Sequence, residues 1–190
     1  IQGVAIHSPP TTDKPLVADI SSVILSEPID VSKFSLIYAG AQKNIGPAGL
    51  TMVIIEKELM KMENEALPNI LRYSKHSESD SMLNTPPTFS WYMAGKVFKW
   101  VKKSGGLDYF QEQNHKKASS LYTFIDSSSL YNNPVSVENR SIMNIPFILA
   151  DNNVDANFVE EAEQAEVLNW KGHRSVGGMR ASIYNARPIE

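Results

Sequence analysis

Four short apolar segments crowd into the first 57 residues, and their spacing limits how the chain can fold. They cover residues 1–6, 16–22, 34–41 and 50–56. Such near-continuous apolarity is typical of strands that are covered on both faces in an α/β sheet. The connections are too short for a regular run of crossover helices, since each crossover usually takes at least about 10–12 residues. We therefore expect a mixed sheet whose antiparallel pair flanks Lys43.

The remainder of the chain predicts helices followed by a small α/β unit. Pro86 and Pro87 suit the start of a helix over 84–106, because the N–H that proline lacks has no intrahelical partner there. Apolar residues at helical spacing predict a second helix over 107–126. The pattern further predicts a polar loop over 75–83, a strand over 142–150, an acidic helix over 155–172 and a closing strand over 175–185.

The charge and the composition exclude several classes of protein. The formal net charge of −3 gives no general attraction to nucleic acid or to anionic lipid, so we expect neither as a partner. The chain has no cysteine, which excludes disulfides and cysteine nucleophiles and fits a reducing compartment. Isolated histidines at 7, 76 and 115 have no companions at metal-ligand spacing, so we predict no metal. We expect a cytoplasmic protein.

Lys43 stands among small residues in AGAQKNIGPAG, between two apolar segments, and it has three interpretations. The first is a solvated turn lysine, which the spacing alone favours. The second is a phosphate-binding lysine, but Gly46 and Gly49 follow the lysine instead of preceding it as they would in a P-loop. The third is a Schiff-base lysine, whose amine would lose its proton more readily among apolar groups.

Asp19 lies in LVADISS, an apolar segment, 24 residues before Lys43. A carboxylate embedded in such a strand needs a polar partner. It is either a satisfied aspartate at a strand end or the partner of a pyridinium nitrogen, which keeps a cofactor ring protonated as an electron sink. The second interpretation gives Asp19 and Lys43 complementary tasks in one site.

Four segments in a fixed order resemble the phosphoserine aminotransferases. They are VADISS, AGAQKNIGPAG, NTPPTFSWY and GHRSVGGMRASIYNA, and the resemblance runs over nearly the whole chain. These are class V pyridoxal-phosphate enzymes of the aspartate-aminotransferase fold type. The resemblance implies an α/β fold: residues 1–101 would be the remainder of the cofactor-binding large domain, with its mixed sheet and linking helix. Residues 102–190 would be the small C-terminal α/β domain without its last helix.

The resemblance assigns five residues to the cofactor, pyridoxal 5'-phosphate. Lys43 would form the Schiff base and move a proton at the substrate α-carbon, and Asp19 would bond the pyridine nitrogen. Gln42 would lie beside the cofactor phosphate, although a polar residue that ends a strand needs no such role. Asn84 and Thr85 would reach the phosphate in the neighbouring subunit, which implies a homodimer with a shared site; taken by themselves they suit a helix cap.

The resemblance assigns the substrate to the last of the four segments. Arg180 would bind the α-carboxylate, because a guanidinium can grip a carboxylate with two hydrogen bonds. His173 and Arg174 would bind the distal phosphate or carboxylate. Each of the three could instead form a surface salt bridge, least so Arg180, which lies inside an apolar strand. Ser21 and Ser22 are further candidates for hydrogen bonds near the cofactor.

The reaction implied by the resemblance is a ping-pong transamination. L-glutamate would leave as 2-oxoglutarate, and 3-phosphohydroxypyruvate would become O-phospho-L-serine. This is a step of L-serine biosynthesis, and bacterial relatives can also serve pyridoxine (vitamin B6) synthesis with a related phosphorylated four-carbon substrate. Three alternatives stay open: another fold-type I aminotransferase or lyase, an inactive fragment that dimerises through the helix at 84–101, and a nucleotide-binding module. The last lacks a glycine pattern before a helix.

The resemblance covers about the second half of a full-length family member. The other half would supply the aromatic residue that stacks on the cofactor ring, most of the phosphate loop and a His–Arg pair that contacts substrate. The chain begins without methionine, on an apolar segment, so we expect a fragment of a longer polypeptide. Alone it would expose strand edges and apolar faces, so we expect either that it is ordered and fully active only with a complementary segment or that the given sequence omits residues of the protein.

Overall fold

The computed structural model describes residues 2–172 and 177–189, and His173 and Arg174 lie outside these described residues. Contacts divide the chain into two compact units. One unit is Pro9–Gly106, and the other joins Ile1–Ser8 to Leu107–Glu190. The border at Gly106 lies a few residues after the predicted domain boundary of 101/102, and the first eight residues group with the later unit. The assignment of the two units as large and small domains stays a prediction.

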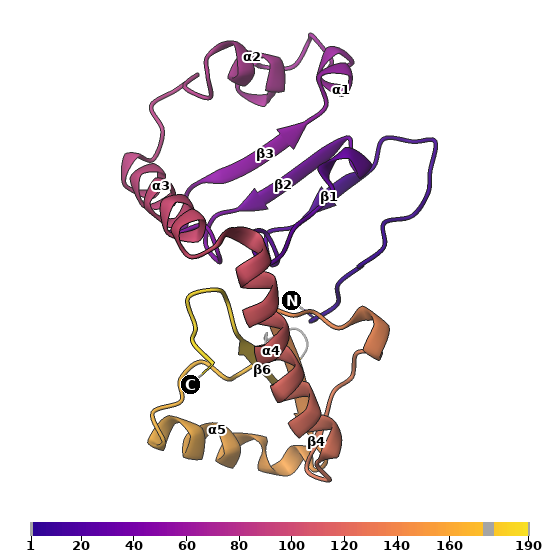
Figure 1. Ribbon diagram of the computed structural model, residues 1–190, viewed down its shortest axis with the longest axis vertical. Helices are drawn as coiled ribbons and strands as arrows, with labels where there is room; N and C mark the ends of the chain where they lie inside the picture. The colour runs from indigo at the N-terminus through magenta and orange to yellow at the C-terminus, as the bar shows by residue number, and fades with distance from the viewer. Residues whose placement is uncertain (1, 173–176, 190) are drawn as a thin grey trace. The chain divides into compact units, whose positions relative to one another are not determined.

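The unit Pro9–Gly106 holds a mixed three-stranded sheet of order β1-β2-β3 (Figure 1). β1 (Val17–Asp19) runs parallel to β2 (Leu36–Gly40), and β2 runs antiparallel to β3 (Thr51–Ile55). The antiparallel pair flanks Lys43, so both the mixed sheet and the position of that pair are confirmed. The strand predicted over 1–6 is wrong, because its described part contributes only an isolated bridge at Val4.

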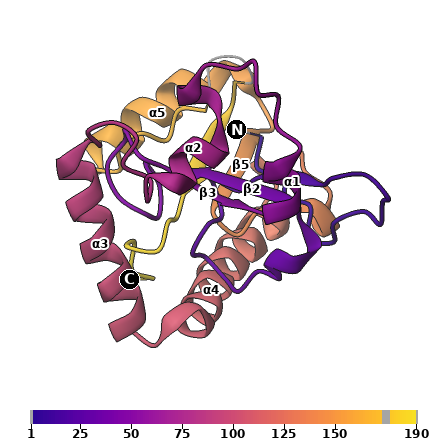
Figure 2. The same cartoon turned by 90° about the horizontal axis from the view of Figure 1, so that it is seen from above.

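This unit also has three α-helices, α1 (Lys57–Lys61), α2 (Tyr73–Glu78) and α3 (Thr88–Lys103), and two short 3₁₀ helices at Val31–Lys33 and Asn69–Leu71. In Figure 1, α1 and α2 lie beyond β3, at one edge of the sheet, and in the view from above in Figure 2 they lie in front of the strands. The prediction of a polar loop over 75–83 is wrong for residues 75–78, which belong to α2. Glu63 explains this local order, because its carboxylate accepts hydrogen bonds from Arg72 Nε at 3.0 Å and from both the backbone N–H and the hydroxyl of Ser74.

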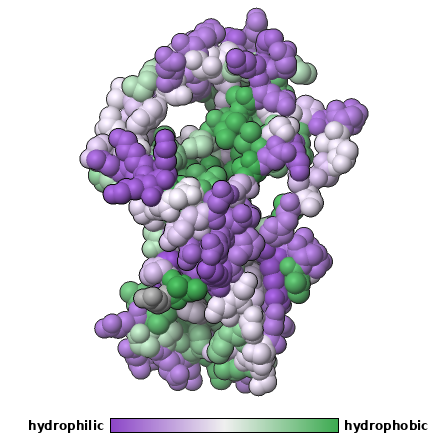
Figure 3. All heavy atoms as spheres, in the orientation of Figure 1, coloured by the Kyte–Doolittle hydropathy of each residue, from purple (hydrophilic) through white to green (hydrophobic). Residues whose placement is uncertain are grey.

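The two faces of this sheet differ in how well they are covered. One face packs into a small apolar cluster, whose buried members are Ile24, Ala39, Ala41, Ile45 and, from α3, Ala94. The other face carries Val17, Tyr38 and Val53, which are exposed by 54%, 38% and 37%, and Tyr38 pairs in register with Val53. Figure 3 shows apolar side chains gathered over this sheet. The expectation that both faces are covered is therefore not met among the described residues, whereas the expected exposed apolar face is present.

The second unit contains an antiparallel sheet of order β4-β5-β6. The long helix α4 (Gly106–Ser127) leads into β4 (Tyr131–Asn132), and β5 (Asn144–Leu149) pairs with β6 (Met179–Ser182). Phe147 of β5 is buried and makes edge-to-face contacts with Tyr131, Phe158 and Trp170, at centroid distances of 5.3–6.0 Å. These rings form the aromatic part of the core, which such contacts stabilise beyond area burial alone.

Helix α5 (Asp155–Gln164) is shorter than the predicted 155–172. It ends in a Schellman motif, in which Val167 N–H donates to Ala162 C=O at 2.8 Å and Glu166 N–H donates to Glu163 C=O at 3.0 Å. Glu166 takes the left-handed position with φ of 61°, where glycine is usual. The sequence therefore lacks the normal stop signal at this helix end.

The first residues pack on β5 of the second unit. Gly3 has φ of +69°, and a Cβ there would lie 2.2 Å from Pro146 Cδ. Its carbonyl accepts from Ser141 N–H at 2.9 Å, and Ala5 N–H donates to Asn139 C=O at 2.8 Å. Glycine is thus required at position 3 by both conformation and space. None of the helices in the described part of the chain is long and apolar enough to cross a membrane.

Candidate active site

Asp19 and Lys43 follow two neighbouring strands at the same edge of the sheet. Asp19 ends β1 and pairs in register with Tyr38 of β2, and Ile20 N–H donates to Tyr38 C=O at 3.0 Å. Lys43 lies in the turn that follows β2. Because β1 and β2 are parallel, their carboxyl ends meet, and this is the edge at which open α/β sheets bind ligands.

A tight turn after β1 carries the polar residues of this edge. Val23 N–H and Ile24 N–H both donate to Ile20 C=O, at 2.9 and 2.8 Å. Leu25 follows with φ of 63°, a left-handed conformation that is rare for a bulky residue and costs roughly 1–3 kcal/mol. The buried side chain of Asn44 donates from Nδ2 to Ile24 C=O at 2.9 Å, so it ties this turn to the residue next to Lys43.

Ser21 holds the carboxylate of Asp19. Its hydroxyl donates to Asp19 Oδ1 at 2.6 Å and its backbone N–H donates to the same oxygen at 2.9 Å. The hydroxyl also accepts from Gly40 N–H at 2.9 Å, which links the ends of β1 and β2. The side chain of Asp19 is exposed, not embedded as the sequence suggested.

The charge of Asp19 is stabilised by its surroundings. Partial burial acts to raise the pKa of Asp19, but the two hydrogen bonds from Ser21 and the positive charge of Lys43 outweigh it. The pKa of Asp19 therefore lies below its usual value, and the group is an anion at neutral pH.

Lys43 is half-buried, and its ε-amine donates to Ser22 Oγ at 2.5 Å. Ser22 belongs to the turn after β1, three residues beyond Asp19. The interpretation of Lys43 as an ordinary solvated turn lysine is therefore less favoured, since the amine is directed onto a defined partner. The structure brings together Asp19, Ser21, Ser22 and Lys43 from two separate segments.

Gln42 has an exposed side chain that folds back along the end of β2. A Cβ at Gly40 would lie 2.5 Å from Gln42 Oε1, so the glycine leaves the room that this side chain occupies. Gln42 is thus placed on the same turn as Lys43. Its predicted contact with a phosphate stays a prediction.

Asn84 and Thr85 are exposed and lie just before α3. Pro87 takes the N-cap position, and no side chain caps this helix. Asn84 Nδ2 instead donates to Thr85 C=O at 3.1 Å. The helix-cap interpretation of these two residues is therefore wrong, and their predicted role at a phosphate is not tested by it.

The start of α3 packs against the turn that carries Lys43. Ser90 Oγ donates to Ala48 C=O at 2.8 Å. Gly49 has φ of +105°, a conformation in which a side chain would be strained, although an added Cβ would make only ordinary contacts with Ser90 and Pro87. The last glycine of AGAQKNIGPAG thus serves the turn that packs on α3.

Arg180 lies in the second unit, on β6 opposite Pro146 of β5. Its backbone N–H donates to Trp170 C=O at 2.8 Å. Its Nε is buried and has no hydrogen-bond partner among residues 2–172 and 177–189. A buried guanidinium nitrogen without a partner is costly, which suits a group that awaits an anionic ligand.

Asn44 was not singled out by the sequence, although it is 95% buried and joins the two turns. Its signal was weak: an amide next to Lys43, in a segment of otherwise small residues. Of the lone histidines, His7 Nε2 lies 3.0 Å from Arg140 C=O and His76 Nε2 lies 2.9 Å from Ile70 C=O. Within the described ranges no group of three His, Asp or Glu residues could hold a metal ion.

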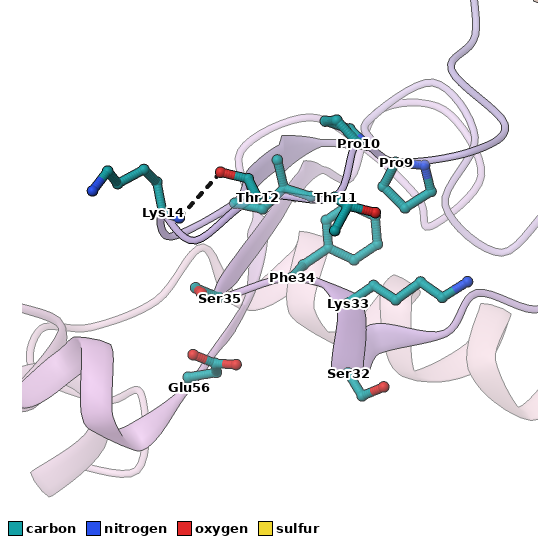
Figure 4. A pocket seen from close by; sticks show the side chains of 11 residues that line it. Pro9, Pro10, Thr11, Thr12, Lys14, Ser32, Lys33, Phe34, Ser35 and Glu56 are labelled. Atoms are coloured by element: carbon teal, nitrogen blue, oxygen red, sulfur yellow. Dashed lines mark hydrogen bonds between the residues drawn. The ribbon is translucent and has the colours of Figure 1, made fainter.

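A cavity of about 400 Å³ lies at the opposite edge of the same sheet, near the start of β1 and β2 (Figure 4). Phe34 and Ser35 line it below the loop that contains Thr11 and Thr12. Figure 4 shows the Lys33 side chain pointing away from this loop. The cavity is thus at the amino ends of the parallel strands, away from Asp19 and Lys43.

The chain is similar to known proteins over nearly its whole length. Residues 9–190 match the family described as aminotransferase class-V. A curated relative, phosphoserine aminotransferase of Hahella chejuensis, is 58% identical over 182 residues, which are 96% of this chain and 50% of the relative. The chain therefore spans about half the length of the curated relatives that it matches.

Solved structures show the same similarity. Phosphoserine aminotransferase from Bacillus circulans subsp. alkalophilus superposes with a TM-score of 0.95 at 47% identity, over 100% of this chain and 53% of that one. A PLP-bound phosphoserine aminotransferase from Trichomonas vaginalis gives 0.94 at 41% identity, over 100% and 54%. The mixed α/β architecture expected from the sequence is confirmed.

Proposed function

The chain belongs to the class-V aminotransferase family, and on that premise we propose that it acts in phosphoserine transamination. L-glutamate would donate the amino group, and 3-phosphohydroxypyruvate would receive it to give O-phospho-L-serine. The observation that carries the proposal is the pairing of Asp19 and Lys43 at one sheet edge, with Asp19 held as an anion. The names of the relatives support the substrate assignment.

The residues at this edge fit pyridoxal phosphate by their chemistry. An amine and a carboxylate anion are the two groups that its aldehyde and its ring nitrogen require. Pyridoxal phosphate, when bound, supplies an electron sink for the bonds of the substrate α-carbon. Lys43 and Asp19 would hold it, with Gln42 beside its phosphate.

Each of the two central residues has a task that its surroundings support. Asp19 stays charged because Ser21 and Lys43 stabilise the carboxylate, so it can keep a ring nitrogen protonated. Lys43, when its amine is free, would move the proton at the substrate α-carbon, for which a half-buried amine on a short turn is well placed. Proton transfer of this kind contributes about 10²–10⁴-fold in rate.

The substrate would be bound by cationic groups. Arg180 would take the α-carboxylate, and its Nε, which is buried without a partner among the described residues, supports this. His173 and Arg174 would bind the distal phosphate or carboxylate. The same pair would separate phosphorylated from small uncharged substrates, because a desolvated cation needs an anionic partner.

A homodimer in the cytoplasm is the form that we propose. Asn84 and Thr85 would reach the cofactor phosphate of the partner subunit. Both are exposed and neither caps α3, which leaves them available for such a contact. The absence of cysteine fits the reducing cytoplasm.

One labelling experiment tests the proposal. The protein is mixed with pyridoxal phosphate and reduced with borohydride, and the adduct is located by peptide mapping. We expect the adduct on Lys43, its loss in Lys43→Ala and its retention in Lys33→Ala, a lysine of the same unit. Incubation with L-glutamate before reduction should remove it by forming 2-oxoglutarate. A wild-type protein without an adduct on Lys43 would contradict the proposal.

The substrate class is tested separately. The aminated cofactor form is offered 3-phosphohydroxypyruvate and, as a matched control, hydroxypyruvate without the phosphate. A preference for the phosphorylated compound of at least about 100-fold is expected, because a charged group in its site is worth a few kcal/mol. Equal use of both would favour another aminotransferase of this fold.

A further inference from the structure

The hydroxyls of the adjacent residues Ser21 and Ser22 each bond to a different charged group of the candidate site. Ser21 donates to the carboxylate of Asp19 at 2.6 Å. Ser22 accepts from the ε-amine of Lys43 at 2.5 Å and is itself half-buried. The amine therefore has a defined position on the protein itself.

A hydroxyl is suited to an amine that changes its protonation state. Its oxygen can accept a hydrogen bond from an ammonium, and its O–H can donate to a neutral amine after rotation. A carbonyl oxygen could only accept, and a carboxylate would favour the ammonium strongly. Ser22 can thus hold Lys43 in both states.

We propose that Ser22 is the positioning residue that receives the amine of Lys43 whenever that amine is not covalently engaged. The proposal rests on the role of Lys43 proposed above and goes beyond it, because it assigns the place to which the amine returns. While it is bonded to Ser22, the amine stays at the carboxyl ends of β1 and β2, where it must take up and deliver a proton. A free lysine side chain would otherwise have to be ordered anew in every turnover, at a cost in entropy.

The position of Ser22 is fixed by its turn. Backbone hydrogen bonds to Ile20 close the turn on one side, and Leu25 follows in a left-handed conformation. The buried amide of Asn44 joins Ile24 to the segment of Lys43. The hydrogen bond of Asn44 therefore holds the turn of Ser22 and the segment of Lys43 together. The distance between the hydroxyl and the amine thus does not depend on the conformation of the Lys43 side chain alone.

The first test uses the protein without cofactor. Lys43 is acetylated with acetic anhydride at neutral pH, and its rate is measured by mass spectrometry against Lys33 in the same digest. In Ser22→Ala the rate at Lys43 should rise about three- to tenfold, because the ammonium loses an acceptor and more free amine is present. Ser22→Thr, which retains a hydroxyl, should restore the wild-type rate, and Ser32→Ala should not change it.

The second test uses the protein loaded with pyridoxal phosphate. Ser22→Ala should lower kcat with L-glutamate about tenfold, leave KM within about twofold and enlarge the isotope effect of α-deuterated glutamate, since proton transfer becomes slower. Ser22→Cys has a side chain of similar size but with a weaker acceptor, so its kcat should lie between those of the wild type and Ser22→Ala. If a thermal melt shows that Ser22→Ala does not fold, kcat and the isotope effect are measured on Ser22→Cys instead.

The outcomes separate the two proposals. Unchanged acetylation and unchanged kcat in folded Ser22→Ala, with a normal adduct on Lys43, would overturn the role of Ser22 alone. An absent adduct in the wild type would overturn the proposed function, and the acetylation rates would still decide whether Ser22 holds the amine. A fall in kcat that Ser22→Thr does not restore would assign Ser22 to packing and overturn its positioning role.

Discussion

Lys43 and Lys117 show how the acceptor decides what a shielded lysine can do. Lys117 of α4 is 8% exposed, and its Nζ donates to three main-chain carbonyls, those of Ile183 at 3.1 Å, Tyr184 at 3.1 Å and Arg187 at 3.0 Å. Lys43, in the other unit, directs its amine onto the hydroxyl of Ser22.

The difference lies in the chemistry of the oxygens. Carbonyls only accept, so three of them favour the ammonium form of Lys117, although burial lowers the pKa of Lys117 below its usual value. The amine is fully committed to joining α4 to the chain after β6. A hydroxyl that can also donate leaves Lys43 free to change state. The three carbonyls around Lys117 therefore suit a structural lysine, and the hydroxyl beside Lys43 suits a lysine that transfers protons.

The largest effect is expected from Lys43→Ala. Transamination should fall by about 10⁴-fold or more, since both the covalent anchor and the proton carrier are lost. The melting temperature should stay close to that of the wild type, because a half-buried turn residue contributes little to the core. The glutamate half-reaction and a thermal melt measure the two quantities. A large drop in stability would show that Lys43 resembles Lys117 more than we propose.

Asp19→Asn should have the next largest effect. The amide cannot keep a ring nitrogen protonated, so the rate should fall by about 100-fold while the adduct on Lys43 still forms. Asp30→Asn is a matched control, because Asp30 Oδ1 accepts from the hydroxyl and N–H of Ser32 just as Asp19 does from Ser21. The two rates are compared in the glutamate half-reaction, and equal effects would sink the assignment of Asp19.

Lys117→Met should affect stability alone. Three main-chain carbonyls in partly buried hydrogen bonds would lose their donor, so the free energy of unfolding should fall by about 2–3 kcal/mol. Urea denaturation measures this loss, and Lys116→Met is the control, since Lys116 is a neighbouring lysine in a largely exposed ion pair with Glu112. Formation of the adduct on Lys43 should be unchanged in both variants. Loss of the adduct in Lys117→Met would contradict the claim that Lys117 serves stability alone, in contrast to Lys43.

Ser21→Ala should have the smallest effect, seen as a change in pH dependence. Removing the hydroxyl should raise the pKa of Asp19 toward its usual value, which carboxylate ¹³C NMR would follow. A lowered pKa in the folded state stabilises the protein above the pKa of the unfolded state, and that stability is lost as pH falls through the folded-state pKa. The variant should therefore lose more stability at neutral pH than in strong acid, where only the loss of the hydrogen bond from Gly40 N–H remains. An unchanged NMR titration would contradict the role of Ser21.

The sequence was informative where local pattern determines structure. The apolar segments on both sides of Lys43 predicted the antiparallel pair β2–β3, and helical spacing predicted α3 and α4. Asp19 and Lys43 were expected to act together, and the parallel pairing of β1 with β2 places them at one edge.

What the sequence missed depends on partners far away or on unusual backbone. Lys117 looks like any surface lysine of α4, because its three acceptors lie 66–70 residues further along the chain. The end of α5 requires Glu166 in a left-handed conformation, for which the residue type gives no signal. The buried Asn44 gains its role only when the turn after β1 is folded against it.

The chain passes between its two units twice, once after Ser8 and once after Gly106. The second unit is therefore discontinuous in sequence, because the whole of the other unit separates Ile1–Ser8 from Leu107–Glu190. The double passage also means that one cut by a protease in the loop after Ser8 would leave both units on a single polypeptide.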